Sequence, residues 1–217
     1  MKKELAIQIA GCEVLLLADK ALYLPLHRIL CIADAHFGKA AAYRALGQPV
    51  PRGTTASNLA RIDALLSRYA VRELVFLGDF LHAPQSHALG TLAALQDWRH
   101  HHPKLACKLV RGNHDLRAGD PPDALAIEVI NEPYFETPFA LRHTPASHAT
   151  HHVIAGHIHP VFQLQGMGRQ RLRLPCFHTT DHLTLLPSFG EFTGGHSVQV
   201  TPLSRTFITE GTGIWAV

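Results

Sequence analysis

Side chains that bind metal ions recur along this 217-residue sequence, each directly after a short run of β-forming residues. In chain order, five runs are followed by Asp34-Ala35-His36, Gly78-Asp79, Gly112-Asn113-His114-Asp115, His143 and Gly156-His157-Ile158-His159. In open α/β sheets, ligand sites collect where the carboxyl ends of strands meet. We therefore expect these five segments to lie together at one edge of a sheet.

The donor types in these segments indicate divalent cations, and no serine or cysteine nucleophile is needed. One aspartate can bridge two cations, while neutral imidazoles and an amide oxygen complete mixed coordination that suits Mn²⁺, Fe or Zn²⁺. Seven candidate ligands are too many for one closed structural zinc site, but they suit two cations with positions left open for solvent and substrate. The candidates are Asp34, His36, Asp79, Asn113, His143, His157 and His159.

The motifs in this order, D-x-H, G-D, G-N-H-D, a single histidine and G-H-x-H, resemble those of the calcineurin-like metallophosphoesterase superfamily. Further stretches are similar to the bacterial ligase-associated phosphoesterases of the DNA damage response, so the resemblance extends over nearly the whole chain. They are residues 50–55, 78–83, 111–122, 169–177 and 186–195. The resemblance implies an α/β fold of two packed mixed β-sheets flanked by helices, the α/β/β/α sandwich.

The resemblance also implies a role for each motif residue. One metal ion would be held by Asp34, His36, Asp79 and His159, and the second by Asp79, Asn113, His143 and His157, with Asp79 bridging. His114 would be a catalytic residue beside the scissile phosphate, and Asp115 would orient it. The two cations would activate a water as hydroxide for in-line attack, and His114 would donate a proton to the leaving oxygen or steady its charge.

One position departs from the G-D-x-x-D pattern of many superfamily members. His82 takes the last place of that motif, a variant similar to the one in DNA-repair nucleases of the superfamily. We therefore expect His82 to contact the substrate or to support the ligands, and not to bind metal.

Basic side chains near the motifs are candidates for binding phosphate. Arg117 follows the G-N-H-D motif and Lys39 follows D-x-H, with Lys39 the weaker candidate because a charged residue near a cleft is often only solubilising. Arg169, Arg171 and Arg173 alternate and would share one face of a strand. This stripe either grips nucleic-acid phosphates or lies in solvent, and the residues alone leave both interpretations open.

The hydrophobic pattern predicts the elements that position these residues. Strands are expected at 13–17, 28–33, 73–77, 106–110, 127–130, 139–142, 153–155, 171–174 and 183–186, and helices at 39–46, 57–68 and 87–102. The first half thus alternates strand and helix, whereas the half after Pro121-Pro122 is mostly strands. No repeat, charge run or long linker divides the chain, so we expect one metallophosphoesterase domain over residues 1–217.

Composition excludes several other classes of protein. With 47% hydrophobic and 17% charged residues the chain is not a disordered tail protein, and a net charge of +3 is too mild to diagnose nucleic-acid binding. The four cysteines are widely spread and favour reduced thiols in the cytoplasm. No apolar run is long enough to span a bilayer, and Glu4 and Gln8 interrupt the one segment that resembles an export signal.

Together these features predict a cytoplasmic phosphodiesterase that uses two divalent ions. Manganese is the expected metal, with Zn²⁺, Fe and Co²⁺ as alternatives, and DNA in bacterial repair is the expected substrate, with a ligase or helicase as further partners. One alternative is a phosphomonoesterase or small-nucleotide phosphodiesterase using the same site. Another is a metal-stabilised interaction module in a repair complex, although such a module would need neither His114 nor open metal positions.

Overall fold

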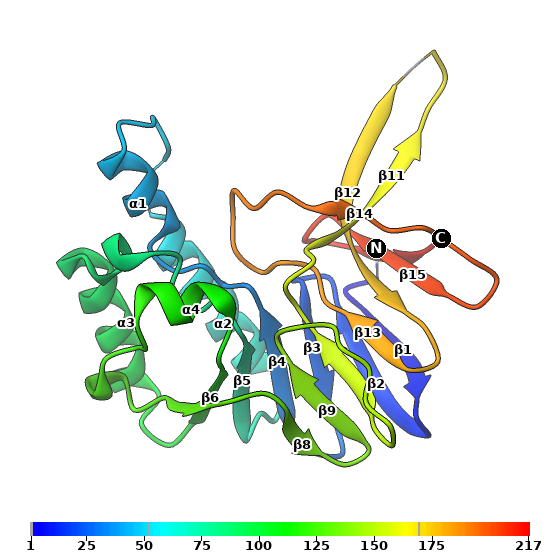
Figure 1. Cartoon of the computed structure of the whole chain (residues 1–217), viewed down its shortest axis with the longest axis horizontal. Coiled ribbons are helices and arrows are strands. Elements are labelled where there is room, and N and C mark those ends of the chain that lie inside the picture. Colours follow the sequence, from blue (N-terminus) through cyan, green and yellow to red (C-terminus); the bar gives the residue numbers. More distant parts are fainter. Residues whose placement is uncertain (1, 52, 169) are drawn as a thin grey trace.

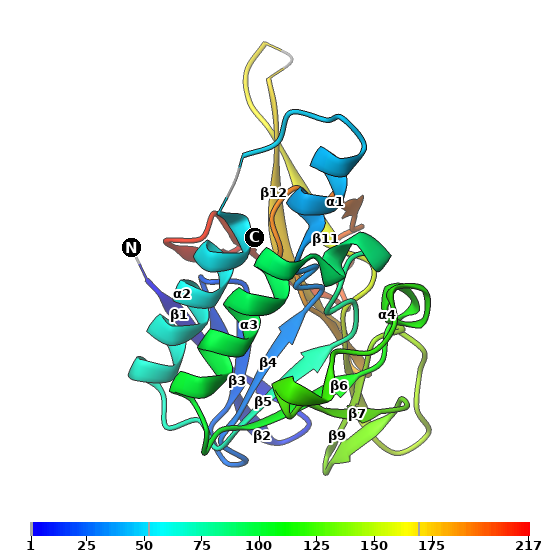
Figure 2. The same ribbon diagram turned by 90° about the vertical axis from the view of Figure 1, so that its left-hand side faces the viewer.

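Two mixed β-sheets pack face to face, and the α-helices lie on the outer face of the first sheet (Figure 1). The computed structural model describes residues 2–51, 53–168 and 170–217. Figure 2 shows α2 and α3 side by side in front of the first sheet. The predicted fold class is confirmed.

The first sheet has the strand order β1-β2-β3-β4-β5-β6-β7, antiparallel as far as β4 and parallel from there on. Its strands are β1 (Glu4–Ile9), β2 (Cys12–Leu17), β3 (Ala21–Leu24), β4 (Ile29–Ala33), β5 (Glu73–Leu77), β6 (Ala106–Val110) and β7 (Glu128–Ile130). Because β4, β5 and β6 run in the same direction, the residues that follow them emerge at one edge of the sheet.

The second sheet has the order β14-β11-β12-β13-β10-β9-β8, with β15 on β12 and β16 on β15. Its strands are β8 (Tyr134–Glu136), β9 (Phe139–Arg142), β10 (His152–Ala155), β11 (Pro160–Gln165), β12 (Arg171–Thr179), β13 (Leu183–Leu185), β14 (His196–Ser197), β15 (Arg205–Thr209) and β16 (Ile214–Ala216). Strands β9 and β10 are parallel, so they also end at one edge. The hairpin of β11 and β12 projects from the body of the molecule (Figure 1).

The helices are α1 (Lys39–Ala45), α2 (Thr54–Arg68), α3 (Leu89–His101) and α4 (Asn113–Ala118), with short 3₁₀ helices at Pro84–His87 and Asp123–Leu125. Helix α2 buries Leu59, Ile62 and Leu65, whose spacing places them on one helical face. No helix in the described part of the chain is both long and apolar enough to cross a membrane.

The first sheet is buried on both faces, because its strands alternate their side chains between two apolar clusters. On the helix side, Leu30 and Ile32 of β4 join a cluster that includes Trp98 of α3. On the other side, Ile29 and Cys31 join a cluster shared with Phe139 and Phe177 of the second sheet. The molecule's other tryptophan, Trp215, lies half-exposed on β16. Strand β4 is therefore apolar throughout, as is typical of a central parallel strand.

A polar network joins the two sheets near Glu73, the first residue of β5. The Lys108 ammonium lies 3.1 Å from the Glu73 carboxylate and donates to the Tyr134 hydroxyl at 2.8 Å. That hydroxyl donates to Glu136, the neighbour of Tyr134 on β8, at 2.6 Å. Glu73 is buried, so its charge is compensated by Lys108 from the adjacent strand.

Candidate metal centre

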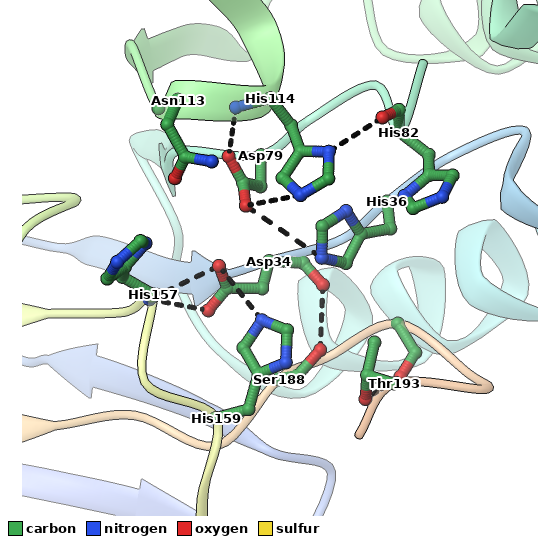
Figure 3. Close-up of polar contacts among 12 residues, drawn as sticks. Asp34, His36, Asp79, His82, Asn113, His114, His157, His159, Ser188 and Thr193 are labelled. Carbon is green, nitrogen blue, oxygen red and sulfur yellow. Dashed lines mark hydrogen bonds and ion pairs between the residues drawn. The ribbon is translucent and has the colours of Figure 1, made fainter. Parts of the chain in front are cut away.

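Four of the five predicted segments are labelled in Figure 3, where they meet at one edge of the packed sheets, and His143 joins them through contacts with Asn113 and His157. They follow β4, β5, β6, β9 and β10, and direct contacts link all seven candidate ligands to one another. The expectation that parallel strands deliver these side chains to a common place agrees with this geometry.

The first group of donors consists of Asp34, His36, Asp79 and His159, whose ligand atoms all lie within 4.8 Å of one another. His159 Nε2 is 3.3 Å from Asp34 Oδ1, and His36 Nε2 is 3.9 Å from Asp79 Oδ2. His159 Nδ1 faces the Gly194 carbonyl oxygen at 3.2 Å, to which only a protonated nitrogen can donate. The proton of the neutral ring is thus held on Nδ1, and the Nε2 lone pair points into the site.

The second group is arranged around His143. Its Nε2 is 2.8 Å from Asn113 Oδ1, 3.0 Å from His157 Nδ1 and 3.5 Å from Asp79 Oδ1. Its Nδ1 donates to the Leu77 carbonyl oxygen at 3.0 Å, which again leaves Nε2 with a free lone pair in the neutral ring. Asp79 thus presents one oxygen to each group.

Divalent cations fit this donor set. Asp34 and Asp79 are 0% and 2% exposed, and their ion-pairing partners within the described chain are imidazoles alone. Buried carboxylates need positive charge nearby. Among the described residues, the buried Nε2 of His159, which faces the Asp34 carboxylate, has no hydrogen-bond partner. Unpaired imidazole nitrogens beside buried carboxylates are the arrangement that metal binding satisfies.

The backbone is bent sharply at the candidate ligands. Five of them have positive φ angles: Asp34 (53°), His36 (47°), Asp79 (51°), His157 (69°) and His159 (50°). Glycines permit the close approach of neighbouring segments, because a Cβ on Gly78 would lie 2.1 Å from His143 Nδ1 and one on Gly156 would lie 2.6 Å from Asp34 Oδ2. The G-D and G-H-x-H motifs therefore require glycine at these positions, because any larger residue would collide with the side chain of His143 or Asp34.

Comparison with known proteins agrees with this geometry. Residues 27–176 match the family model described as calcineurin-like phosphoesterase. The chain belongs to the calcineurin-like phosphoesterase family. It is similar to the solved structure of Pseudomonas putida nuclease MPE, with a TM-score of 0.88 and 46% identity over 99% of this chain and 100% of that chain. No curated protein matched the sequence.

A second solved structure, that of Yfce, a phosphoesterase from E. coli, matches with a TM-score of 0.45 and 16% identity, over 87% of this chain and 97% of that one. That likeness is too low to carry an argument about the site. The family and the donor groups together make this chain a metal-dependent phosphoester hydrolase.

His114 of this phosphoesterase lies beside the first donor group, partly exposed. Its Nε2 is 3.9 Å from Asp79 Oδ2, and its backbone N–H donates to Asp79 Oδ1 at 2.9 Å. Its Nδ1 donates to the His82 carbonyl oxygen at 2.8 Å, so Nε2 points into the site. The rings of His82 and His114 stack with their centroids 5.1 Å apart. His82 thus orients His114 through both its carbonyl group and its ring.

The role expected for Asp115 needs correction. Its carboxylate accepts backbone hydrogen bonds from Phe80 at 2.9 Å, Leu81 at 3.3 Å and Gly112 at 2.9 Å. Asp115 therefore fixes the turn after β5 that carries Asp79. The His114 ring is oriented by the His82 carbonyl group instead of by Asp115. Burial raises the pKa of Asp115 to about 6, although the donated N–H groups oppose this shift.

Burial also keeps two histidines neutral. It lowers the pKa of His36 far below its ordinary value, and the positive charge of nearby Lys39 acts in the same direction. Burial and Lys39 together lower the pKa of His82 to about 4. Neutral imidazole is the form that binds metal or accepts a hydrogen bond.

Lys39 lies closer to the site than the sequence suggests. It is only 8% exposed at the start of α1, and burial lowers its pKa while Asp79 and Asp34 partly offset the effect. Arg117, by contrast, is exposed on α4. Of the arginine stripe, Arg171 and Arg173 are exposed on β12, and Arg169 lies outside the described residues.

The segment after β13 supports the site through contacts that the motifs do not reveal. Ser188 Oγ and the Gly190 N–H both donate to the Asp34 carbonyl oxygen at 3.0 Å. Gly194 supplies the carbonyl group that orients His159. The only sequence signal for this segment was its resemblance to the ligase-associated phosphoesterases, which gave it no role.

Proposed function

We propose that this chain, acting as a single domain over residues 1–217, is a dinuclear metal-dependent phosphodiesterase that cleaves DNA. The observation that carries the proposal is the position of Asp79, whose two oxygens face two separate sets of nitrogen and oxygen donors. A carboxylate placed in this way suits a bridging ligand. The whole-length similarity to a bacterial nuclease supports nucleic acid as the substrate class.

Two divalent ions, Mn²⁺ in this proposal, would occupy the two donor groups and supply charge stabilisation and activation of water. Asp34, His36 and His159 would hold the first with Asp79, and Asn113, His143 and His157 the second. Two bound cations would also compensate the buried charge of Asp34 and Asp79.

His114 would act on the leaving group. Since its Nδ1–H is held by the His82 carbonyl, proton exchange with the substrate takes place at Nε2. In the imidazolium form Nε2 can give its proton to the leaving oxygen, and in the neutral form it can only accept one. In this proposal His114 acts as a general acid and His82 as a positioning residue.

The cellular setting completes the proposal. A DNA-cleaving phosphodiesterase in the bacterial cytoplasm fits repair, with a ligase or helicase as a partner, as the resemblance of the sequence implies. The exposed Arg171 and Arg173 on the projecting hairpin provide positive charge for a flanking strand.

The test is hydrolysis by the purified, manganese-loaded chain of diester and monoester model phosphates and of a single-stranded oligonucleotide. We expect diesters and the oligonucleotide to be cleaved well above monoesters, and chelation to abolish the activity. A preference for monoesters would show a phosphomonoesterase instead. Stoichiometric metal binding with no hydrolysis of any ester would favour an interaction module.

A further inference from the structure

A short arch of chain, Gly190–Gly194, stands at the rim of the metal centre and is clamped at both ends. At its start, Gly190 lies so close to the segment after β4 that a Cβ there would be 2.6 Å from the Ala35 carbonyl oxygen. At its end, the Gly194 carbonyl accepts from His159. Within the arch, Thr193 Oγ1 donates to the Gly190 carbonyl at 3.4 Å. The arch is therefore held in place by the segments that carry metal ligands.

An ion pair fixes the middle of the arch to α2. The Glu191 carboxylate lies 3.2 Å from an Arg61 guanidinium nitrogen and 3.9 Å from the Lys20 ammonium. Arg61 is itself packed over the Phe189 ring at 3.7 Å. The side chain of Glu191 is thus directed toward the protein, and the next residue is left to point outward.

That next residue, Phe192, is an aromatic side chain in an unfavourable position. It is 46% exposed, and its φ angle of 56° lies in the left-handed region that bulky residues avoid. Exposing a phenylalanine and straining its backbone both cost free energy. Such a residue at the rim of an active site points to a task in binding.

Phe192 lines a cavity of about 120 Å³ that adjoins the metal centre. His159 belongs both to the cavity wall and to the first donor group. Pro160 and Pro175 add flat apolar surface, while Lys20 and Thr193 add polar groups. Figure 3 shows Thr193 on the same side of the site as Ser188 and His159.

We propose that Phe192 and this cavity bind a nucleobase adjacent to the scissile phosphate, by stacking on the phenylalanine ring. The proposal rests on the proposed function, since it presumes a nucleic-acid strand at the metal centre. A base is attached one sugar away from its phosphate, so a strand bound at the metals would bring a base to the wall that His159 shares. Stacking accepts any base, because every base has a π-face, and the site would therefore favour single strands over a particular sequence.

The first experiment measures binding of a short single-stranded oligonucleotide containing 2-aminopurine, whose fluorescence reports stacking. The manganese-loaded His114→Ala protein serves as background, because slow cleavage allows equilibrium to be reached. Adding Phe192→Ala should raise Kd about 5- to 100-fold and reduce the fluorescence change, whereas Phe192→Tyr should retain both. Phe135→Ala, on an equally exposed phenylalanine of β8 that does not line the cavity, is the matched control and should change neither.

The second experiment changes the substrate as well as the protein. A series of oligonucleotides carries one abasic position at successive sites. Cleavage at each phosphate is measured with the wild-type protein and with Phe192→Ala. One abasic position, at a fixed offset from the scissile phosphate, should lower kcat/KM by a factor similar to that of Phe192→Ala, and the two changes together should cost little more than either alone.

Equal affinity of Phe192→Ala and its parent, or additive effects of the abasic position and the substitution, would overturn the base site. Cleavage that is unaffected by both changes would refute the base site and leave the phosphodiesterase intact. Normal stacking at Phe192 without any hydrolysis would refute the phosphodiesterase and leave the base site intact.

Discussion

At the candidate ligands, the side-chain types suit the backbone as well as the metal. Asp and His are among the few non-glycine residues that enter the left-handed region with some ease, and every left-handed ligand here is one of these two. Each such position still costs on the order of 1 kcal/mol. These turns direct candidate ligands from separate strands to one point. The site therefore cannot assemble without the free-energy cost of the left-handed backbone.

The glycines beside the ligands should be intolerant of even one methyl group. In Gly156→Ala the new Cβ would lie 2.6 Å from Asp34 Oδ2 and displace a buried carboxylate. We expect loss of tight metal binding, measured by elemental analysis after dialysis, with circular dichroism unchanged. The control is Gly90→Ala, where a Cβ meets open space in α3, and this variant should bind metal normally. Equal metal content in both variants would show that the site does not require glycine at position 156.

Asp79 should couple the two metal positions. In Asp79→Asn one of the two oxygens is replaced by an uncharged amide, so both donor groups lose a charged ligand together. We expect two ions per wild-type chain and weakened binding of both in the variant, measured by isothermal titration with Mn²⁺. A single tight ion that survives the substitution would contradict the dinuclear arrangement.

His114 should affect turnover without affecting metal content. Its Nε2 faces the site from outside both donor groups, and its Nδ1 is held by a carbonyl group. We expect His114→Ala to lower kcat by about 10²–10⁴-fold, as for the loss of a general acid. Elemental analysis should still find the wild-type metal content, and loss of metal in this variant would make His114 a ligand instead.

At the scale of elements, the sequence pattern predicted best the short strands that contain at most one charged residue besides their apolar ones. β5, β6 and β9 have the expected bounds of 73–77, 106–110 and 139–142. The strands missed include β11, which begins with Pro160, and the expected strand 171–174 in fact continues through Pro175 to Thr179. Proline is tolerated there because Pro160 is the first residue of β11, and Pro175 pairs with Val161 on one side while the pairing of β12 with β15 begins only at Cys176. A single-sequence pattern cannot show this.

Helix α4 was also missed, for a different reason. Its six residues carry the G-N-H-D motif and have no apolar periodicity long enough to indicate a helix. The helix is held instead by Asp115, which caps it by accepting from the Gly112 N–H. Its contacts are with the metal-site turn, which exists only in the folded chain.

The projecting β11–β12 hairpin should contribute positive charge to strand binding. Arg171 and Arg173 alternate on β12, and Arg173 also donates to the Gly195 carbonyl at the base of the hairpin. For Arg171→Gln/Arg173→Gln we expect weaker binding of single-stranded DNA and a log Kd–log salt slope smaller by about 1.4, since each phosphate contact contributes about 0.7. Affinity and slope equal to the wild type would place both arginines in solvent only.

At the scale of the whole molecule, the network of Glu73, Lys108 and Tyr134 ties the two sheets together at the end opposite the metal centre. Lys108→Met would leave the buried Glu73 carboxylate without its cation. We expect the free energy of unfolding to fall by about 2–4 kcal/mol, discounted slightly because the Lys108 side chain is 18% exposed.

Urea unfolding measures this effect, and metal content provides a check that the site is intact. Lys104→Met, on an exposed lysine nearby in sequence, is the control and should change stability by no more than about 0.5 kcal/mol. Equal stability of the two variants would show that the network contributes nothing net.

The sequence predicts the candidate ligands but not the groups that orient them. Each ligand follows a strand whose hydrophobic run is visible in the sequence, and parallel strands must end together. The orienting groups of His143, His114 and His159 are carbonyl oxygens of Leu77, His82 and Gly194. Every residue type carries such an oxygen, so no residue pattern could reveal them.

The two tryptophans lie on opposite sides of the sheet pair, and each therefore serves as an intrinsic fluorophore for its own half. Trp98, buried against the helices and donating to Asp63 at 2.6 Å, should emit toward the blue. Trp215, 37% exposed on β16, should emit further to the red. Replacing each in turn by phenylalanine would let the two layers be followed separately during denaturation, and coincident curves would mean that the sandwich melts as one cooperative unit.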